Sequence, residues 1–280
     1  MNPAVSTGGR RGLWLFFGFL VVFLYAPIVI LIVFSFNDRI FVSFPWQGFT
    51  LRWYREFLSN SVMISALQTS AYVALITAVV TVVLAIPASI VLVRRRFFAK
   101  GLVSGVLLAP LVIPLIVFGL ALLILFNTLG IPLSPLTIVI GHVVVALPFA
   151  ILTLVPRLER IPAWLEEASR DLGAGALTTF RSITFPLLAP AVVSAFLISF
   201  VISFDEVVVA SFIAGDQPTF PIYLYSQLRL PRRLPQVIAV AVVVLIVSVI
   251  VVVASEVGRR IADRRLERET AAVAQEVSVA

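Results

Sequence analysis

Two adjacent carboxylates, those of Asp205 and Glu206, interrupt a long apolar stretch of the chain, in the sequence SFDEVVVASF at residues 203–212. A carboxylate placed among apolar residues in a membrane loses hydration, which costs a few kcal/mol. Such groups are usually kept for a solute path, a partner charge or a cation, so we interpret the pair as functional. Because successive helical residues point about 100° apart, we expect one side chain to face a path and the other a neighbouring helix.

Residue types for covalent catalysis and metal binding are scarce. The chain has no cysteine and one histidine, His142, which excludes thiolate metal sites and a zinc site of two histidines. A serine hydrolase would need His142 as its base, and no Gly-x-Ser-Gly arrangement surrounds a serine. We therefore expect no catalytic residue, metal ligand or cofactor in this chain, and interpret His142 as a helix-to-helix hydrogen-bonding residue. There is also no phosphate-binding Gly-x-x-x-x-Gly-Lys-Ser/Thr sequence, so any ATPase must be another chain.

The elements that position these residues are expected to be membrane helices. Of the 280 residues, 61% are apolar and 12% are charged, and the mean hydropathy is +1.11. We expect an all-α membrane protein with a single domain at residues 1–258 and a charged cytoplasmic tail at 259–280. The six expected spans are at about 13–36, 64–93, 103–127, 136–156, 187–214 and 236–258. Prolines that would free backbone carbonyls, as suits helices lining a path, lie in or near the spans: Pro87, Pro110, Pro114, Pro148 and Pro190.

The basic residues predict the orientation of the spans. An even number of spans puts both termini on one side, and 15 of the 21 Lys and Arg residues then fall on that side. The positive-inside rule makes this side, with both termini, cytoplasmic. The net charge of +7 follows from this asymmetry, and no basic stripe with interleaved aromatics indicates nucleic-acid binding. We interpret the run Arg94-Arg95-Arg96 as the charged end of a span.

A polar island at residues 157–185 separates two apolar spans on the cytoplasmic side. Pro162 fits the first position of a helix, and Gly173 fits the left-handed position just after its end. Leu165, Ala168 and Leu172 would form one apolar edge of this helix. A helix of roughly three turns with a small-residue face is suited to docking into a groove of a partner.

The same island resembles the EAA loop of ABC importer permeases. The match consists of EASRDLG at 167–173 and, nine residues later, ITFP at 183–186. Ser169 replaces an alanine of the family pattern and Phe185 replaces a leucine. The resemblance implies that this loop receives the motion of a cytoplasmic ATPase through Glu167, Ala168, Gly173, Ile183 and Pro186.

A finer resemblance covers the acidic pair. The sequence SFDEVVVASF is similar to a signature of the second permease subunit of spermidine/putrescine-type ABC importers, and WQGFT at 46–50 with WY at 53–54 matches the same family's first extracytoplasmic loop. This implies a polyamine or a related small organic cation as solute, with Asp205, Glu206 and Trp46 on its path. One departure is Leu115, which follows Pro114 where members commonly carry an acidic residue.

The resemblance further implies an assembly in the bacterial cytoplasmic (inner) membrane, with the fold of a type I ABC importer permease. The expected partners are a second permease subunit, two ATP-binding subunits that bind ATP and Mg²⁺, an extracytoplasmic solute-binding protein and the lipid membrane. Alternatives are a permease for another small solute, such as ferric iron or an amino-acid-like or opine-like compound, a channel outside the ABC class, and an intramembrane enzyme. A passive channel would have no use for a coupling loop.

Overall fold

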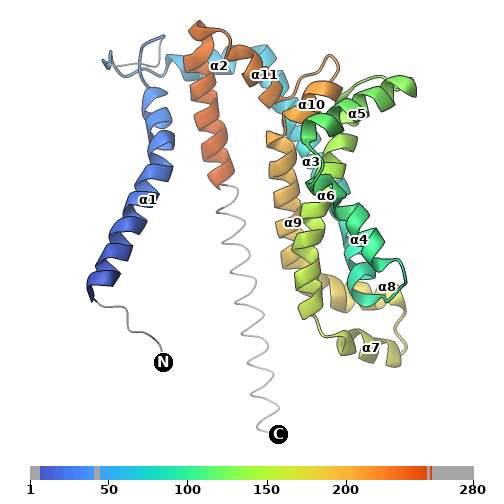
Figure 1. The fold of residues 1–280 in the computed structure, drawn as a ribbon. Coiled ribbons are helices and arrows are strands. Elements are labelled where there is room, and N and C mark those ends of the chain that lie inside the picture. Colours follow the sequence, from blue (N-terminus) through green and yellow to red (C-terminus); the bar gives the residue numbers. More distant parts are fainter. Residues whose placement is uncertain (1–6, 41–44, 251–252, 254–280) are drawn as a thin grey trace. The chain divides into compact units, whose positions relative to one another are not determined.

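The computed structural model describes residues 7–40, 45–250 and 253 (Figure 1). The described chain is helical apart from connecting segments and an isolated bridge between Asn37 and Phe49, which confirms the all-α prediction. The expected tail at 259–280 and the end of the sixth expected span lie outside the described residues. The described residues divide into two compact units, one made of residues 7–40, 45–61, 225–250 and 253 and one made of residues 62–224.

The first unit contains α1 (Thr7–Phe34), α2 (Arg52–Ser59), the short η3 (Pro231–Arg233) and an apolar helix at Leu234–Ile250. The central part of α1 is apolar and exposed. Such a surface is suited to contact with lipid or with another subunit. The amphipathic α2 buries Trp53, whose Nε1 donates a hydrogen bond of 2.9 Å to the backbone oxygen of Asn37. Gln236 donates a side-chain hydrogen bond to Glu56 and so joins the apolar helix to α2.

The second unit holds the longest series of packed helices. These are α3 (Ser61–Arg94), α4 (Lys100–Leu108), η1 (Ala109–Leu111), α5 (Leu115–Thr128), α6 (Pro135–Arg160), α7 (Ala163–Asp171), α8 (Ala176–Thr179), the π-helical turn η2 (Phe180–Thr184), α9 (Phe185–Asp205) and α10 (Val208–Ile213). Its last element is the start of α11 (Phe220–Gln227).

Two apolar clusters hold the second unit together, and α3 and α6 contribute to both. Toward one end, Ile138 of α6 packs with Leu122 of α5 and Val209 of α10. Toward the other end, Leu154 of α6 packs with Leu188 of α9 and with residues of α3. Between them α6 and α9 run side by side (Figure 1). Burial of large aliphatic side chains along both lengths fixes the two helices as a scaffold.

Within the part of the chain that the structure describes, four segments are long and apolar enough to cross a membrane as single helices: Arg10–Phe34, Ser61–Arg94, Pro135–Arg160 and Ala176–Asp205. The stretch expected at 103–127 is instead two helices, Lys100–Leu111 and Leu115–Thr128, bent by 100° at the break. Pro114 at this break has a ψ of 126°, which leaves the helical region, and proline has no N–H to continue the ladder.

The stretch expected at 187–214 is broken as well. The helix α9 ends at Asp205, Glu206 is extended with φ −70° and ψ 117°, and α10 begins at Val208. The two acids therefore lie at the end of α9 and in the extended break after it, and not within one unbroken helix. The carboxylate of Glu206 explains the break, because it bonds to the backbone that follows, as described below.

Close packing between α5 and α10 depends on Gly119. A Cβ atom at this position would lie 2.7 Å from Cδ2 of Phe212 and 3.2 Å from Cα of Val209. Both distances are shorter than ordinary van der Waals contact, so a side chain here would push the two helices apart.

We expect Gly119→Val to destabilise the protein by about 1 to 3 kcal/mol, because overpacking forces the backbones of α5 and α10 to move. The measurement is the melting temperature of the detergent-purified protein, which should fall. The matched control is Gly105→Val, since Gly105 is also helical but has no atom within 4 Å of its added Cβ. Equal melting temperatures for the two variants would contradict the packing argument.

Candidate functional site

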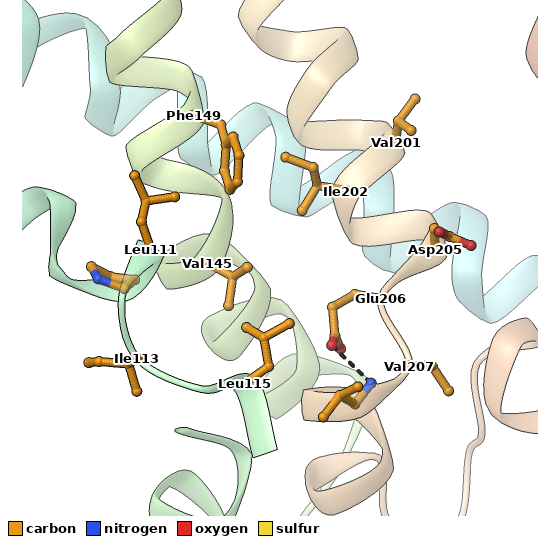
Figure 2. Close-up of a pocket in the computed structure, with 12 residues that line it drawn as sticks. Leu111, Ile113, Leu115, Val145, Phe149, Val201, Ile202, Asp205, Glu206 and Val207 are labelled. Atoms are coloured by element: carbon orange, nitrogen blue, oxygen red, sulfur yellow. Dashed lines mark hydrogen bonds between the residues drawn. The ribbon is translucent and has the colours of Figure 1, made fainter. Parts of the chain in front are cut away.

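A pocket of about 480 Å³ lies where the two helix breaks of the second unit come together (Figure 2). Its polar side chains are the two acids of the SFDE sequence, Asp205 and Glu206. Its walls are otherwise apolar and come from η1, α5, α6 and α9, including Leu111, Ile113, Leu115, Val145, Phe149 and Ile202. The break between η1 and α5 and the break between α9 and α10 therefore line one pocket, and the acidic pair lies in it. Membrane transport sites are often built from broken helices in this way.

Glu206 is fully engaged by the protein. Its Oε1 accepts hydrogen bonds of 2.9 Å from the backbone N–H groups of Val208 and Val209, and its Oε2 accepts one of 2.9 Å from Ala210. Figure 2 shows the bond to Val208 as a dashed line. These N–H groups belong to the first turn of α10. The first N–H groups of a helix have no carbonyl acceptor within that helix. Glu206 is 8% exposed and serves as the cap that starts α10.

Asp205 lies in a different environment. Within the described residues its side chain has no hydrogen bond or ion pair, and it is exposed in the isolated chain. In Figure 2 its carboxylate points away from Val145 and Leu115, whereas Glu206 points toward them. Asp205 is also the last residue of α9, where the carbonyl ends of the helix already carry partial negative charge. The free carboxylate at the rim of the pocket is therefore that of Asp205.

His142 connects α6 to α9, as predicted from its type and position. Its Nδ1 lies 2.8 Å from Oγ of Ser203, and its Nε2 lies 3.2 Å from Oε2 of Glu206. Serine, histidine and glutamate are also the residue types of a hydrolase triad. Here Ser203 is 3% exposed and His142 is 1% exposed, so a solute in the pocket does not reach the serine oxygen. The bond between Nδ1 and Ser203 joins α6 to α9, and Nε2 lies beside the carboxylate that caps α10.

Two of the three predicted path residues lie in the pocket. Asp205 and Glu206 share the pocket, and Leu115, at the position where the resemblance implies an acid, is another of its lining residues. Trp46 belongs to the first unit, in the segment between α1 and α2, where it is 41% exposed. Its place on the path stays a prediction.

The helix in the polar island ends as the local sequence predicts. The helix α7 ends at Asp171, and Gly173 follows with a φ of +85°. The N–H of Gly173 bonds to the oxygen of Arg170 at 2.8 Å, and that of Ala174 bonds to the oxygen of Ser169 at 3.1 Å. This pair of bonds is a Schellman motif, which needs a left-handed residue and therefore favours glycine.

The start of α7 differs by one residue from the prediction. Pro162 has a ψ of 129° and stands before the helix, which begins at Ala163. The expected coupling residues Glu167, Ala168 and Gly173 are all exposed, as is Leu172 at 89%. Ile183 is half-buried in η2, and Pro186 is exposed in the first turn of α9. One face of α7 is thus available to a partner.

Glu166, which the sequence did not mark as a site residue, is 7% exposed and bonds to Arg94 and Thr184. Arg94 is accordingly more than the charged end of a span. No local signal marks this pair, because its members are 72 residues apart in the chain.

The chain also matches known proteins. A family model described as "Binding-protein-dependent transport system inner membrane component" matches residues 81–268. The spermidine/putrescine transport system permease protein PotC of Escherichia coli (strain K12) is 38% identical over 209 residues, which cover 74% of this chain and 79% of that protein. The putrescine transport system permease protein PotI of the same strain is 37% identical over 216 residues, which cover 74% of this chain and 76% of that protein.

A solved structure shares the fold. A chain of a bacterial ABC transporter involved in the import of the acidic polysaccharide alginate superposes with a TM-score of 0.72 at 18% identity, over 90% of this chain and 99% of that chain. At that identity the likeness concerns the fold alone.

The helical fold is that of an ABC importer permease. This chain belongs to the family of binding-protein-dependent transport system inner membrane components, and it resembles polyamine permeases among the relatives compared.

Proposed function

We propose that this chain is a transport subunit that carries polyamines, such as putrescine or spermidine, into the cytoplasm. The observation that carries the proposal is the carboxylate of Asp205, which has no partner within the described residues and lies at the rim of an apolar pocket. An ammonium group there would meet both this carboxylate and the negative end of α9. The apolar walls suit the methylene chain of a polyamine. The names of the relatives PotC and PotI support the same class of solute.

Other solutes fit the pocket less well. Ferric iron would require several oxygen or nitrogen ligands, and the described residues contain no group of three or more His, Asp or Glu side chains placed to hold a metal ion. An amino-acid-like or opine-like solute carries a carboxylate of its own, which Asp205 would repel. Leu115 leaves the pocket with one carboxylate fewer than the polyamine pattern, so we expect a weak hold on the cation, which favours release.

The assembly that we propose has six spans in this subunit. Four are the single long helices, another is the bent pair of α4–η1 with α5, and the last begins at Leu234. The subunit pairs with a second permease, which covers the exposed surfaces of the path. Solute comes from a solute-binding protein outside the membrane, and the fold works by alternating access of the type I class.

In this proposal α7 is the docking helix for an ATP-binding subunit, which supplies ATP and Mg²⁺. Its exposed Glu167, Ala168 and Leu172 form the contact surface, and the turn at Gly173 directs the chain from α7 back toward α9. Two ATP-binding subunits would serve the two permeases. A channel without energy input would leave this surface without a use.

We expect the end of the unit that carries α7 to be cytoplasmic. Ser182 in η2 and Gln217 after α10 are both exposed and lie beyond opposite ends of α9, whose 21 residues span about 30 Å. In inside-out membrane vesicles, an impermeant thiol reagent should label Ser182→Cys and not Gln217→Cys, and in intact spheroplasts the reverse. Reversed labelling of both positions would overturn the orientation.

The solute is tested by two measurements on the unmodified system. Mass spectrometry of the ligand released from the cognate solute-binding protein should identify a polyamine. Cells that express the complete transporter should take up labelled putrescine or spermidine, and cells lacking this subunit should not. A different ligand in the binding protein together with no polyamine uptake would refute the proposed solute and leave the permease class intact.

A further inference from the structure

A buried polar cluster ties α7 to the ends of two long helices, and the functions proposed above do not use it. Glu166 lies in the first turn of α7 and is 7% exposed. Its Oε1 accepts hydrogen bonds from Nε and Nη2 of Arg94, both at 3.2 Å, and from Oγ1 of Thr184 at 3.1 Å. Arg94 is the last residue of α3, and Thr184 directly precedes α9. One carboxylate oxygen therefore connects three elements.

Arg94 holds the same junction at a second point. Its Nη2 also donates a hydrogen bond of 2.9 Å to the backbone oxygen of Ile161, a buried residue in the connection from α6 to α7. The guanidinium thus forms hydrogen bonds both to α7 and to the segment that leads into it. Arg170, on the exposed side of α7, is farther away, with 4.0 Å between its Nη2 and Oε2 of Glu166.

The direction of these bonds separates the two sides of α7. Glu166 points into the protein, whereas the neighbouring side chains of Trp164 and Glu167 are exposed. A partner that binds the exposed side and moves α7 would pull directly on the Glu166 carboxylate. Hydrogen-bonded ions resist displacement in a way that an apolar contact, which can slide, does not.

Stability alone is a poor explanation for this arrangement. Removing two charges from water offsets much of the attraction between them, so a buried ion pair adds little to stability compared with apolar side chains of similar size. What the pair does supply is a fixed geometry between α7, the end of α3 and the start of α9, because each bond is directional. Fixed connections of this kind carry displacements between distant sites.

We propose that the Arg94–Glu166 pair transmits the displacement of α7 to α3 and α9, so that both are positioning residues for coupling. This inference rests on the proposed role of α7 as the docking helix. Movement of α7 would reach the pocket along α9, because Thr184 precedes the first residue of that helix and Asp205 is its last.

The test is hydrogen exchange on the complete transporter, with and without vanadate trapping of Mg-ATP. In the wild type, trapping should change the protection of α7 and also of the last turn of α3 and the first turn of α9. In the double variant Arg94→Gln with Glu166→Gln, the change in α7 should remain and the changes in α3 and α9 should be lost. Stimulation of ATP hydrolysis by the solute-loaded binding protein should fall about fivefold.

The double variant removes both charges together, so no buried charge is left without its partner. The single variant Glu166→Gln keeps an oxygen that Thr184 can bond but leaves the Arg94 charge without its carboxylate, so its abundance is measured alongside, and the same loss in α3 and α9 is expected. The matched control is Arg95→Gln, which removes an exposed charge beside Arg94 and should respond like the wild type.

Two results would count against the inference, and they differ. If trapping changes nothing in α7 of the wild type, the docking role is wrong and this inference falls with it. If α7, α3 and α9 all respond in both Gln variants as in the wild type, the docking role stands and the transmission by Arg94 and Glu166 is refuted.

Discussion

Replacing Asp205 by asparagine is expected to lower the initial rate of putrescine uptake about tenfold, with unchanged abundance in the membrane. Asp205 is exposed and has no partner within the described residues. The substitution therefore removes no stabilising contact from the isolated subunit. An ammonium group passing the C-terminal end of α9 would lose its attractive carboxylate. The measurement is uptake of labelled putrescine in cells, with abundance measured by quantitative immunoblotting.

Two further substitutions make this result interpretable. Asp216→Asn removes an exposed carboxylate that does not line the pocket and should leave uptake unchanged. Glu206→Gln weakens the cap of α10, because the amide NH₂ cannot accept the bond that Ala210 donates to Oε2, and should lower abundance together with uptake. Normal uptake by the Asp205→Asn variant would exclude Asp205 from the path.

Gly173→Val is expected to lower uptake and solute-stimulated ATP hydrolysis at least about fivefold while the protein still inserts. The φ of Gly173 is +85°, a conformation that costs a β-branched residue more than about 1 kcal/mol. The open space around this residue means that strain in the backbone, and not a clash, is the cause. The turn after α7 would then shift, and the exposed face of α7 would no longer fit its partner.

The matched control for this prediction is two residues away. Gly175 has a φ of −68° and no atom within 4 Å of an added Cβ, so Gly175→Ala should transport normally. Gly173→Asn should retain more activity than Gly173→Val, because asparagine tolerates the left-handed conformation. Full coupling in the Gly173→Val complex would show that this turn does not position the docking helix.

The features that the sequence predicted correctly depend on local rules. Apolar composition requires helices in a membrane, because every backbone N–H and C=O group must be paired within the protein. The end of α7 follows from the glycine two residues after Asp171, since few other residues take a left-handed turn without strain. Membership in the permease family was also readable, because its motifs are contiguous in the chain.

The continuity of the spans was less predictable. Pro114 was visible as a helix breaker, but the 100° bend between the two helices depends on what surrounds it. No proline or glycine in the apolar sequence directly after Asp205 predicts that the helix breaks at Glu206. The break becomes understandable only when the carboxylate is seen to accept three backbone N–H bonds.

The division of roles between the two acids was decided by tertiary structure. By sequence, Asp205 and Glu206 are equivalent neighbours, and composition determined only that an acidic pair among apolar residues needs a use. In the fold, His142 and the first turn of α10 engage Glu206, while Asp205 at the end of α9 stays free within the described residues. Likewise, Glu166 and Arg94 meet only because the chain brings the end of α3 beside α7, a contact between residues 72 positions apart. Local rules determine helices and turns, but the partner of a buried charge depends on long-range packing, which no local pattern encodes.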